Sequence, residues 1–196
     1  MGRPKNFDEE QVLEKALQLF WSRGFFSCSM QELVAMMGIN RFSLYSAFGS
    51  KEGLFNQCMR RYCQRGKRLM FQPLSRPDAG LAELHGFFTR LAEVAGSEKG
   101  ERGCFMNNSL AELDLLNPEA QAIVNRWYAD MRTVFLKALQ RGGAEGALAA
   151  EIDCEALADF LVGTVMGVWS MARTDLPAAH IKRYVETAMA QLPQPA

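Results

Sequence analysis

The apolar positions of this chain recur at helical spacing in one segment after another. In the first segment they repeat every three or four residues, which predicts an amphipathic helix that begins after Asp8 and closes at Gly24. The same spacing returns in a helix capped by Ser50, in a long helix that starts at Asn117-Pro118, and in a helix capped by Asp153. No segment alternates as a strand does. The pattern therefore predicts an all-α protein of about nine helices.

Residues 29–48 form the pattern of two short helices around a tight turn. Ser29 is a good N-cap, because its hydroxyl can accept the backbone N–H of Glu32, whose side chain can reach back. Gly38 supplies the backbone freedom that the turn needs, and Asn40 caps the second helix. This arrangement is typical of a helix-turn-helix, whose second helix enters the major groove of DNA.

The outer face of the second helix distinguishes this segment from an ordinary helical hairpin. Arg41, Ser43 and Tyr45 cluster within about one turn, and Lys51 follows at the start of the next helix. We expect Tyr45 and Lys51 to hold phosphates, with Arg41 and Ser43 closer to base edges. A basic N-terminal arm could lie along the backbone or in the minor groove. The expected DNA-binding residues are Arg3, Lys5, Ser29, Asn40, Arg41, Phe42, Ser43, Leu44, Tyr45, Phe48 and Lys51.

Residues 3–55 resemble the DNA-binding domain of the TetR family of bacterial one-component regulators. The matching residues are Gly2-Arg3-Pro4-Lys5, Ala16 to Phe20, Gly24, Ser29, Leu33, Gly38-Ile39, Ser43-Leu44-Tyr45, Phe48, Ser50-Lys51-Glu52 and Leu54-Phe55. Ser46 and Ala47 depart from the family pattern, which often has a Tyr or His pair there, and Val34 stands where a smaller residue is common. The resemblance implies a homodimer that binds a palindromic double-stranded DNA operator, most often as a repressor that a small-molecule effector releases.

Composition places the chain among ordinary soluble proteins, because 48% of its 196 residues are hydrophobic and 22% are charged. No apolar run approaches the roughly 18 residues of a membrane span, and the N-terminus lacks the apolar core of a signal peptide. We therefore expect a cytoplasmic protein with no membrane partner. The five cysteines are widely spread and form no C-x-x-C pair, so we expect no disulfide framework, no metal site and no cofactor. No nucleophile–base signature or phosphate loop indicates an enzyme.

The formal net charge of zero hides an uneven distribution. Residues 1–68 carry an excess of Lys and Arg, and the remainder carries an excess of Asp and Glu. A basic module beside an acidic one is typical of a nucleic-acid-binding domain joined to something else. We expect a helix-turn-helix domain at residues 6–66 and a helical effector-binding and dimerisation domain at 78–193. The basic run after Arg60 is more simply a solvated face than a DNA contact.

The second half carries polar residues inside an apolar helix. We expect a helix that opens at Asp78, a polar loop at 96–103 and a short helix at 104–116 that contains Asn107, Asn108 and Glu112. Similar Arg-Gly-Cys segments begin the helix that borders the ligand cavity in TetR relatives. Most aromatic and methionine side chains of this half must be core, and some could line a cavity. The expected effector-binding residues are His85, Phe88, Cys104, Phe105, Asn108, Glu112, Trp127, Tyr128, Met166 and Trp169.

Gly163 and Gly167 lie four residues apart on one helix face, with Ser170 about one turn further on. Small residues allow another helix to approach closely, either inside one subunit or between two. Because members of the resembling family pair through their last two helices, we favour Gly163, Gly167 and Ser170 as part of a dimer interface.

Two alternatives to ligand-released repression remain open at the level of sequence. Cys104 follows Arg102 at a predicted helix start, and both features favour a reactive thiolate that could sense electrophiles or oxidants. Burial beside Phe105 would oppose this by raising the thiol pKa. The other alternative is a DNA-binding protein that responds to no effector.

Overall fold

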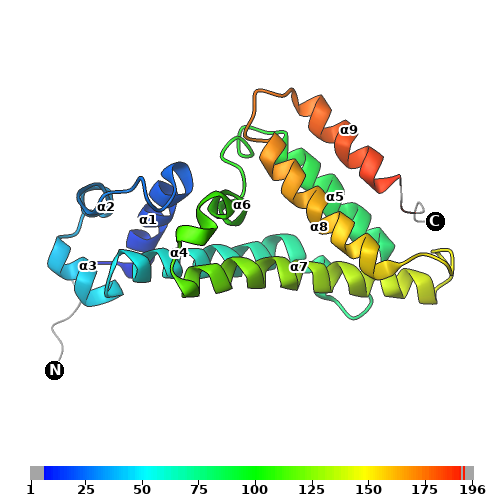
Figure 1. The fold of residues 1–196 in the computed structure, drawn as a ribbon, viewed down its shortest axis with the longest axis horizontal. Helices are drawn as coiled ribbons and strands as arrows, with labels where there is room; N and C mark the ends of the chain where they lie inside the picture. The colour runs from blue at the N-terminus through cyan, green and yellow to red at the C-terminus, as the bar shows by residue number, and fades with distance from the viewer. Residues whose placement is uncertain (1–6, 191, 193–196) are drawn as a thin grey trace. The chain divides into compact units, whose positions relative to one another are not determined.

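The computed structural model describes residues 7–190 and residue 192, and in that range the chain forms helices and no strands (Figure 1). The all-α prediction is therefore confirmed. The helices are α1 (Glu9–Arg23), α2 (Met30–Met37), α3 (Arg41–Phe48), α4 (Lys51–Gly66), α5 (Leu81–Ala95), α6 (Phe105–Ser109), α7 (Pro118–Ala144), α8 (Cys154–Met171) and α9 (Ala178–Met189), with a π-helical turn η1 (Lys67–Phe71) and two 3₁₀ turns, η2 (Pro73–Ser75) and η3 (Leu110–Leu115).

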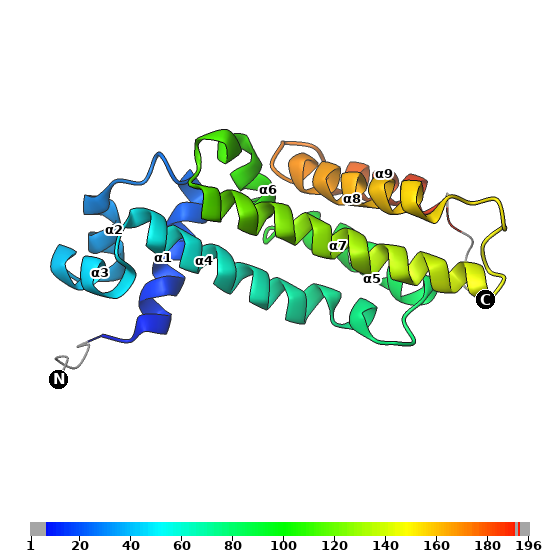
Figure 2. The ribbon, with the colours of Figure 1, turned by 60° about the horizontal axis from the view of Figure 1, so that its bottom comes forward.

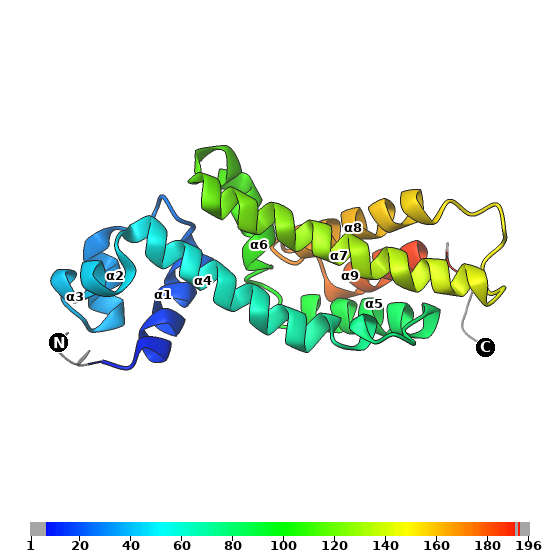
Figure 3. The same ribbon diagram turned by 90° about the horizontal axis from the view of Figure 1, so that it is seen from below.

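The chain divides into two compact units. The first contains the described residues up to Arg65 together with Asn108–Asn125, and the second contains Gly66–Asn107 and the described chain from Arg126 onward. In the first unit α1 packs against α2, and α2 packs against α3 (Figure 3). Its core is closed by apolar side chains that are fully buried, among them Phe20, Leu33, Leu44, Leu54 and Phe55.

The predicted caps of the helix-turn-helix are present. Ser29 and Glu32 form a reciprocal capping box, and the backbone hydrogen bond from Ser29 is the main reason that the pKa of Glu32 is lowered. Gly38 adopts the left-handed conformation with φ 72° and ψ 28°, which a side chain would strain. The Asn40 side chain accepts the Ser43 N–H at 2.8 Å. These local signals confirm both helix starts and the turn between them.

Residues 108–125 pack with the first unit, although the predicted domain ranges placed them in the second. The Glu112 carboxylate accepts the backbone N–H of Phe25 at 2.8 Å and that of Phe26 at 3.2 Å. A Cβ built on Gly24 would lie 2.9 Å from the Glu112 oxygens, so a glycine is needed where the carboxylate approaches. These bonds join a carboxylate to backbone N–H groups that are far away in the sequence, which is why helical periodicity alone did not reveal them.

A buried network of hydrogen bonds joins α4 to the first turn of α7. The Asn56 side-chain amide donates to the Glu119 carboxylate at 2.6 Å and to the Asn117 side-chain oxygen at 3.3 Å. Asn117 also accepts the Ala120 N–H at 3.0 Å, as its predicted capping role requires. Arg60 forms an ion pair with Glu119. Asn56, which is only 2% exposed, therefore has its polar groups satisfied.

The second unit is built on an aromatic cluster. Phe71 stacks on Phe87 with ring centroids 5.6 Å apart, and Trp127 lies 5.1 Å from Phe71. Phe88 and Phe135 extend the cluster, each with a centroid about 5 Å from that of Phe87. Helices α5, α8 and α9 pack against one another and lie side by side in Figure 1, and α8 and α9 are again adjacent in Figure 2.

Two helix predictions in the second unit were wrong in detail. Helix α5 begins at Leu81 with Gly80 as its N-cap, and Glu83 accepts the Gly80 N–H at 2.9 Å, so Asp78 precedes the helix instead of opening it. The helix predicted for residues 104–116 is broken into α6 and the 3₁₀ turn η3. The break comes at Ser109, where the chain passes from the second unit into the first.

Helix α8 is more apolar than the sequence analysis allowed for. Its 18 residues have a mean hydropathy of 1.3, which is enough by length and composition for a membrane span, although core helices of soluble proteins pass the same test. Only 28% of its residues are buried in the described structure, so the other residues of this apolar helix are at least partly accessible to solvent.

We predict that Glu112→Ala destabilises the first unit. The change leaves the buried Phe25 N–H without an acceptor, and such a loss costs about 1–3 kcal/mol in the free energy of unfolding. Urea unfolding followed by circular dichroism at fixed protein concentration measures it. Asp114→Ala, an exposed carboxylate of the same 3₁₀ turn, is the matched control and should change little. Equal effects from the two variants would contradict the role given to Glu112.

Candidate nucleic-acid interface

Two buried side chains fix which face of α3 points outward. Leu44 is fully buried and Phe48 is 5% exposed, so both anchor the helix in the core of the first unit. Both residues were predicted from the sequence to bind DNA. Their burial leaves them no direct access to DNA, and their contribution is to hold α3 in place.

The opposite face of α3 is open to solvent. Phe42 and Ser46 are exposed there, Tyr45 is exposed beside them, and Ser43 is half-buried; Arg41 is exposed at the first residue of the helix. The first turn of α3 contains no acidic residue. A cation, a phenol and a hydroxyl thus share one short helix whose other face is locked into the core. This combination suits contacts with phosphates and base edges.

Lys51 stands at the first residue of α4, beside the end of α3. Its Nζ lies 4.3 Å from the centroid of the Phe25 ring, a cation–π contact that fixes the direction of the side chain. The neighbouring Glu52 has a lowered pKa, because its carboxylate accepts hydrogen bonds from the Glu52 backbone N–H and from the Ser50 hydroxyl. The Ser50 hydroxyl also accepts the Gly53 N–H at 3.0 Å, which confirms the predicted cap.

Two other predicted DNA-binding residues use their side chains as helix caps. The Ser29 hydroxyl accepts the Glu32 N–H at 3.2 Å, and the Asn40 side-chain oxygen accepts the Ser43 N–H. Both residues are exposed, Ser29 at the start of α2 and Asn40 at the start of α3. The predicted arm residues Arg3 and Lys5 lie outside the residues that the structure describes.

The basic run of α4 is largely engaged in ion pairs. Arg61 lies 3.2 Å from Glu10 and 3.5 Å from Glu14, and Arg65 lies 3.7 Å from Glu14. Arg60 pairs with Glu119, as described above. These pairs partly neutralise the positive charge along α4, which agrees with the interpretation of the run as a solvated face.

The predicted effector residues fall into separate places in the structure. Phe88 and Trp127 belong to the aromatic cluster, and Phe105 is 1% exposed, so all three serve as core. Glu112 is bound to the turn after α1 in the first unit. Asn108 also falls in the first unit, at the point where the chain enters it.

A polar link joins three helices of the second unit. The Tyr128 hydroxyl of α7 donates to the Asn107 side-chain oxygen of α6 at 3.2 Å, and the Asn107 amide donates to the Ser170 hydroxyl of α8 at 3.2 Å. Burial, and next the charge of Cys104, raise the pKa of Tyr128 far above its usual value. Cys104 itself is 3% exposed. Asn107 was not among the effector-binding residues predicted from the sequence, because helical spacing placed Asn108 and Glu112 on one face instead.

His85 lies apart from this link. It lines a groove of about 630 Å³ between α5 and α9, together with Thr89, Lys182 and Glu186. Met166 and Trp169 are half-buried on α8. The structure therefore brings Tyr128 near Cys104, whereas His85 lines a different groove of the same unit.

The small residues of α8 have different surroundings. Gly163 is exposed, with open space where a Cβ would be, whereas a Cβ on Gly167 would lie 3.0 Å from the Tyr184 hydroxyl of α9. Gly167 thus makes close packing within the subunit possible. Ser170 is exposed and bonded to Asn107, so of the three predicted interface residues Gly163 alone leaves an open approach.

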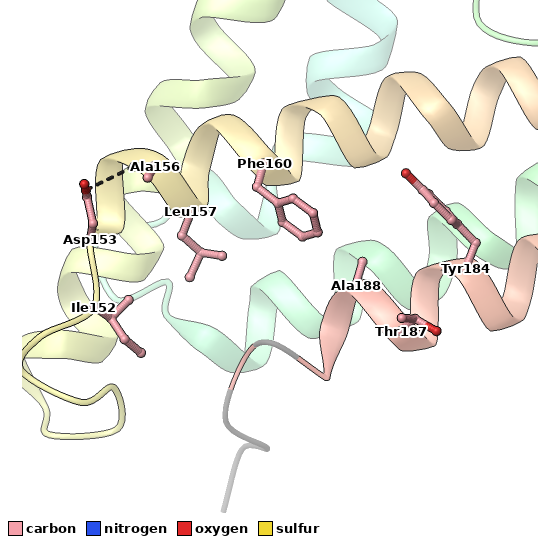
Figure 4. Close-up of a pocket in the computed structure, with 8 residues that line it drawn as sticks. All are labelled: Ile152, Asp153, Ala156, Leu157, Phe160, Tyr184, Thr187 and Ala188. Atoms are coloured by element: carbon pink, nitrogen blue, oxygen red, sulfur yellow. Dashed lines mark hydrogen bonds between the residues drawn. The ribbon is translucent and has the colours of Figure 1, made fainter.

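An apolar groove of about 680 Å³ runs between α8 and α9 (Figure 4). Phe160 extends from α8 and Tyr184 from α9 into the space between the two helices, with 47% and 39% of their surfaces exposed. Leu157 and Ile152 continue the apolar lining toward the start of α8.

Comparisons with known proteins agree with this architecture. Residues 12–58 match the family model for bacterial regulatory proteins of the tetR family, and residues 80–188 match a tetracycline-repressor-like C-terminal domain. The transcriptional repressor ComR of Escherichia coli K12 is 30% identical over 201 residues, which cover 98% of this chain and 92% of ComR. The repressor BdcR of the same organism is 28% identical over 172 residues, covering 88% of this chain and 82% of BdcR.

Solved structures give the same result. A cysteine mutant of the TetR-family regulator CifR, in complex with a 26-base-pair double-stranded operator, has a TM-score of 0.83 and 30% sequence identity. The match covers 98% of this chain and all of that one. Reduced NemR of Escherichia coli, at 19% identity and a TM-score of 0.82, shares the fold over 95% of this chain and 97% of its own. With both of its units matched, the chain belongs to the TetR family of bacterial regulatory proteins.

Proposed function

We propose that the chain is a homodimeric transcriptional repressor that acts in the bacterial cytoplasm. It binds a palindromic double-stranded DNA operator through α3 and leaves it when a small-molecule effector binds the second unit. The observation that carries the proposal is the division of α3 into anchored and exposed residues: Leu44 and Phe48 are buried, while Tyr45 and Arg41, the first residue of the helix, are exposed. ComR and BdcR are named as repressors, and CifR has been seen on its operator, which supports the same activity here.

Phosphate and base contacts divide between the residues of this surface. Lys51 and Tyr45 are the residues proposed to hold phosphates, and the fixed direction of the Lys51 side chain over Phe25 reduces the entropy lost on binding a phosphate. Arg41 begins α3, and the N-terminal residues of a recognition helix contact base edges in the major groove. Its guanidinium can donate two hydrogen bonds to a guanine.

We predict that Lys51→Ala and Arg41→Ala weaken DNA binding in different ways. Loss of Lys51 should lower affinity for all sequences and reduce the salt dependence by about one phosphate contact. Loss of Arg41 should cost about 1–3 kcal/mol on the operator and relax its sequence preference. Fluorescence anisotropy titrations on operator and unrelated duplexes at several salt concentrations measure both effects.

Lys137→Ala is the matched control for these titrations, because it removes an exposed lysine from α7 in the second unit. Its affinity and salt slope should equal those of the parent. If the Lys51 variant behaved like this control, the proposed docking of α3 and α4 on DNA would be wrong.

A second copy of the chain is the proposed cover for the α8–α9 groove. Helix α8 is apolar along its length yet mostly unburied, and Phe160 and Tyr184 are exposed on adjacent helices. A two-fold axis between two such faces buries the same residues on both subunits. It also gives two copies of α3, as a palindromic operator requires.

We predict that Phe160→Asp converts the dimer to a monomer. A carboxylate in the proposed interface would have to be desolvated without a partner, which disfavours association. Sedimentation velocity should show the smaller species, and affinity for the full operator should fall because one α3 reads one half-site. Val94→Asp, which places the same charge on an exposed apolar position of α5, should remain dimeric. A dimeric Phe160→Asp protein would exclude this face as the interface.

The effector is proposed to act on the polar link between Asn107, Tyr128 and Ser170. The chain leaves the second unit after Asn107 and re-enters it at Arg126, two residues before Tyr128. A ligand that replaces the hydrogen bond between Tyr128 and Asn107 therefore changes the positions of the residues that flank both ends of the 108–125 segment. That segment holds the turn after α1 through Glu112.

Thiol sensing through Cys104 is the second candidate function. The observation in its favour is the electrostatic effect of Cys104 on Tyr128, since modification of this thiol would disturb the same polar link. The similar regulator CifR has been studied as cysteine mutants, which supports a test of the cysteines in this chain. The burial of Cys104 at 3% exposure opposes this function, because a reagent must reach the sulfur.

We predict that Cys104 reacts with iodoacetamide more slowly than Cys154 in the native protein at neutral pH. Cys104 is buried and Cys154 is half-exposed at the start of α8, so access favours Cys154. Mass mapping of the labelled peptides over time gives the two rates. Cys58, which is buried and has its pKa raised by burial, serves as the unreactive control. Labelling of Cys104 ahead of Cys154 would favour thiol sensing over non-covalent ligand binding.

A further inference from the structure

Phe42 is the most exposed large apolar side chain in the part of the chain that the structure describes. Its ring is 82% exposed, against 71% for Leu115 and 49% for Tyr45. Single exposed apolar residues are common on protein surfaces. This one stands on the second residue of α3, in the first turn of the helix that faces DNA in the proposed function.

Helix geometry places Phe42 in the middle of the outward face. Successive residues of an α-helix are turned by about 100°, so residues four apart share a side. Leu44 and Phe48 mark the buried side, and Phe42 and Ser46 fall nearly opposite them. Because Ser46 is small and exposed, no larger side chain follows the Phe42 ring along this line.

The exposed ring contributes little to the fold of its own subunit. An 82% exposed side chain buries almost no apolar surface, and Phe has a lower helix propensity than the straight-chain residues usual on helix surfaces. The anchoring of α3 comes from Leu44 and Phe48, and its capping comes from Asn40. A phenylalanine at this position therefore contributes mainly through what the outward face of α3 binds.

We propose that Phe42 reads a thymine in each half-site of the operator by packing its ring against the C5-methyl group. In the major groove thymine alone presents an apolar group, whereas the other bases present only hydrogen-bonding edges there. A phenyl ring has no donor or acceptor, so it would strip water from a polar edge without replacing the lost hydrogen bond. The ring thus favours thymine and also selects against the other bases. This inference rests on the proposed DNA-binding function.

Deoxyuridine provides a direct test, because it differs from thymidine only by the missing methyl group. Operator duplexes recovered by selection from a random DNA pool would carry single thymine-to-uracil changes, made symmetrically in both half-sites. Burial of one methyl group stabilises by about 0.8 kcal/mol, or about fourfold in affinity, so the pair should cost about fifteenfold. We expect one symmetric position to show this loss with the parent protein, and Phe42→Ala to bind the thymine and uracil operators equally.

Leu115→Ala is the matched control, since it removes the next most exposed apolar side chain from the same unit at a distance in sequence from α3. It should retain the full sensitivity to uracil. Parent protein that binds every uracil operator as well as the thymine operator would overturn the proposal, as would equal losses in the parent and Phe42→Ala. A pool that yields no enriched sequence would instead contradict the DNA-binding function itself.

Discussion

The position of the helix-turn-helix depends on one carboxylate. Glu112 accepts the successive backbone N–H groups of Phe25 and Phe26, at the turn that leads from α1 to α2. Charge-assisted bonds of this kind are stronger than bonds between neutral groups, and Gly24 leaves room for the carboxylate. Once the Phe25 backbone is held, its ring packs on Phe20 and Phe55. The same ring lies beneath the Lys51 ammonium. The Glu112 hydrogen bonds therefore hold both the turn that leads into α2 and a residue proposed to bind phosphate.

The Glu112 hydrogen bonds also give the proposed regulation a structural basis. The 108–125 segment belongs to the first unit, but both of its ends continue into the second. Asn107 and Tyr128 flank the segment and share a hydrogen bond, next to the buried Cys104. A change at this bond, by ligand or by thiol modification, reaches Glu112 through covalent chain. The two candidate functions therefore differ in the chemistry of the trigger and share the element that the trigger moves.

Local signals in the sequence were enough to predict the helix-turn-helix. The caps at Ser29, Asn40 and Ser50 depend on residues at most three positions away, and all three are present. The assignment of 108–125 to the first unit depends on bonds between residues 86 and 87 positions apart, which periodicity cannot detect. Spacing alone also could not distinguish Gly163 from Gly167, because only the packing of Tyr184 against Gly167 separates them. In the same way, burial separates Leu44 and Phe48 from the outward residues of α3.

The central claim is that paired copies of α3 read DNA. The most direct measurement is to incubate the purified full-length chain with a pool of random double-stranded DNA and to sequence the molecules it retains. The account predicts an enriched inverted repeat whose half-sites are separated by about one helical turn of DNA or a multiple of it. Retention without sequence enrichment, or enrichment of a single unrepeated half-site, would contradict it.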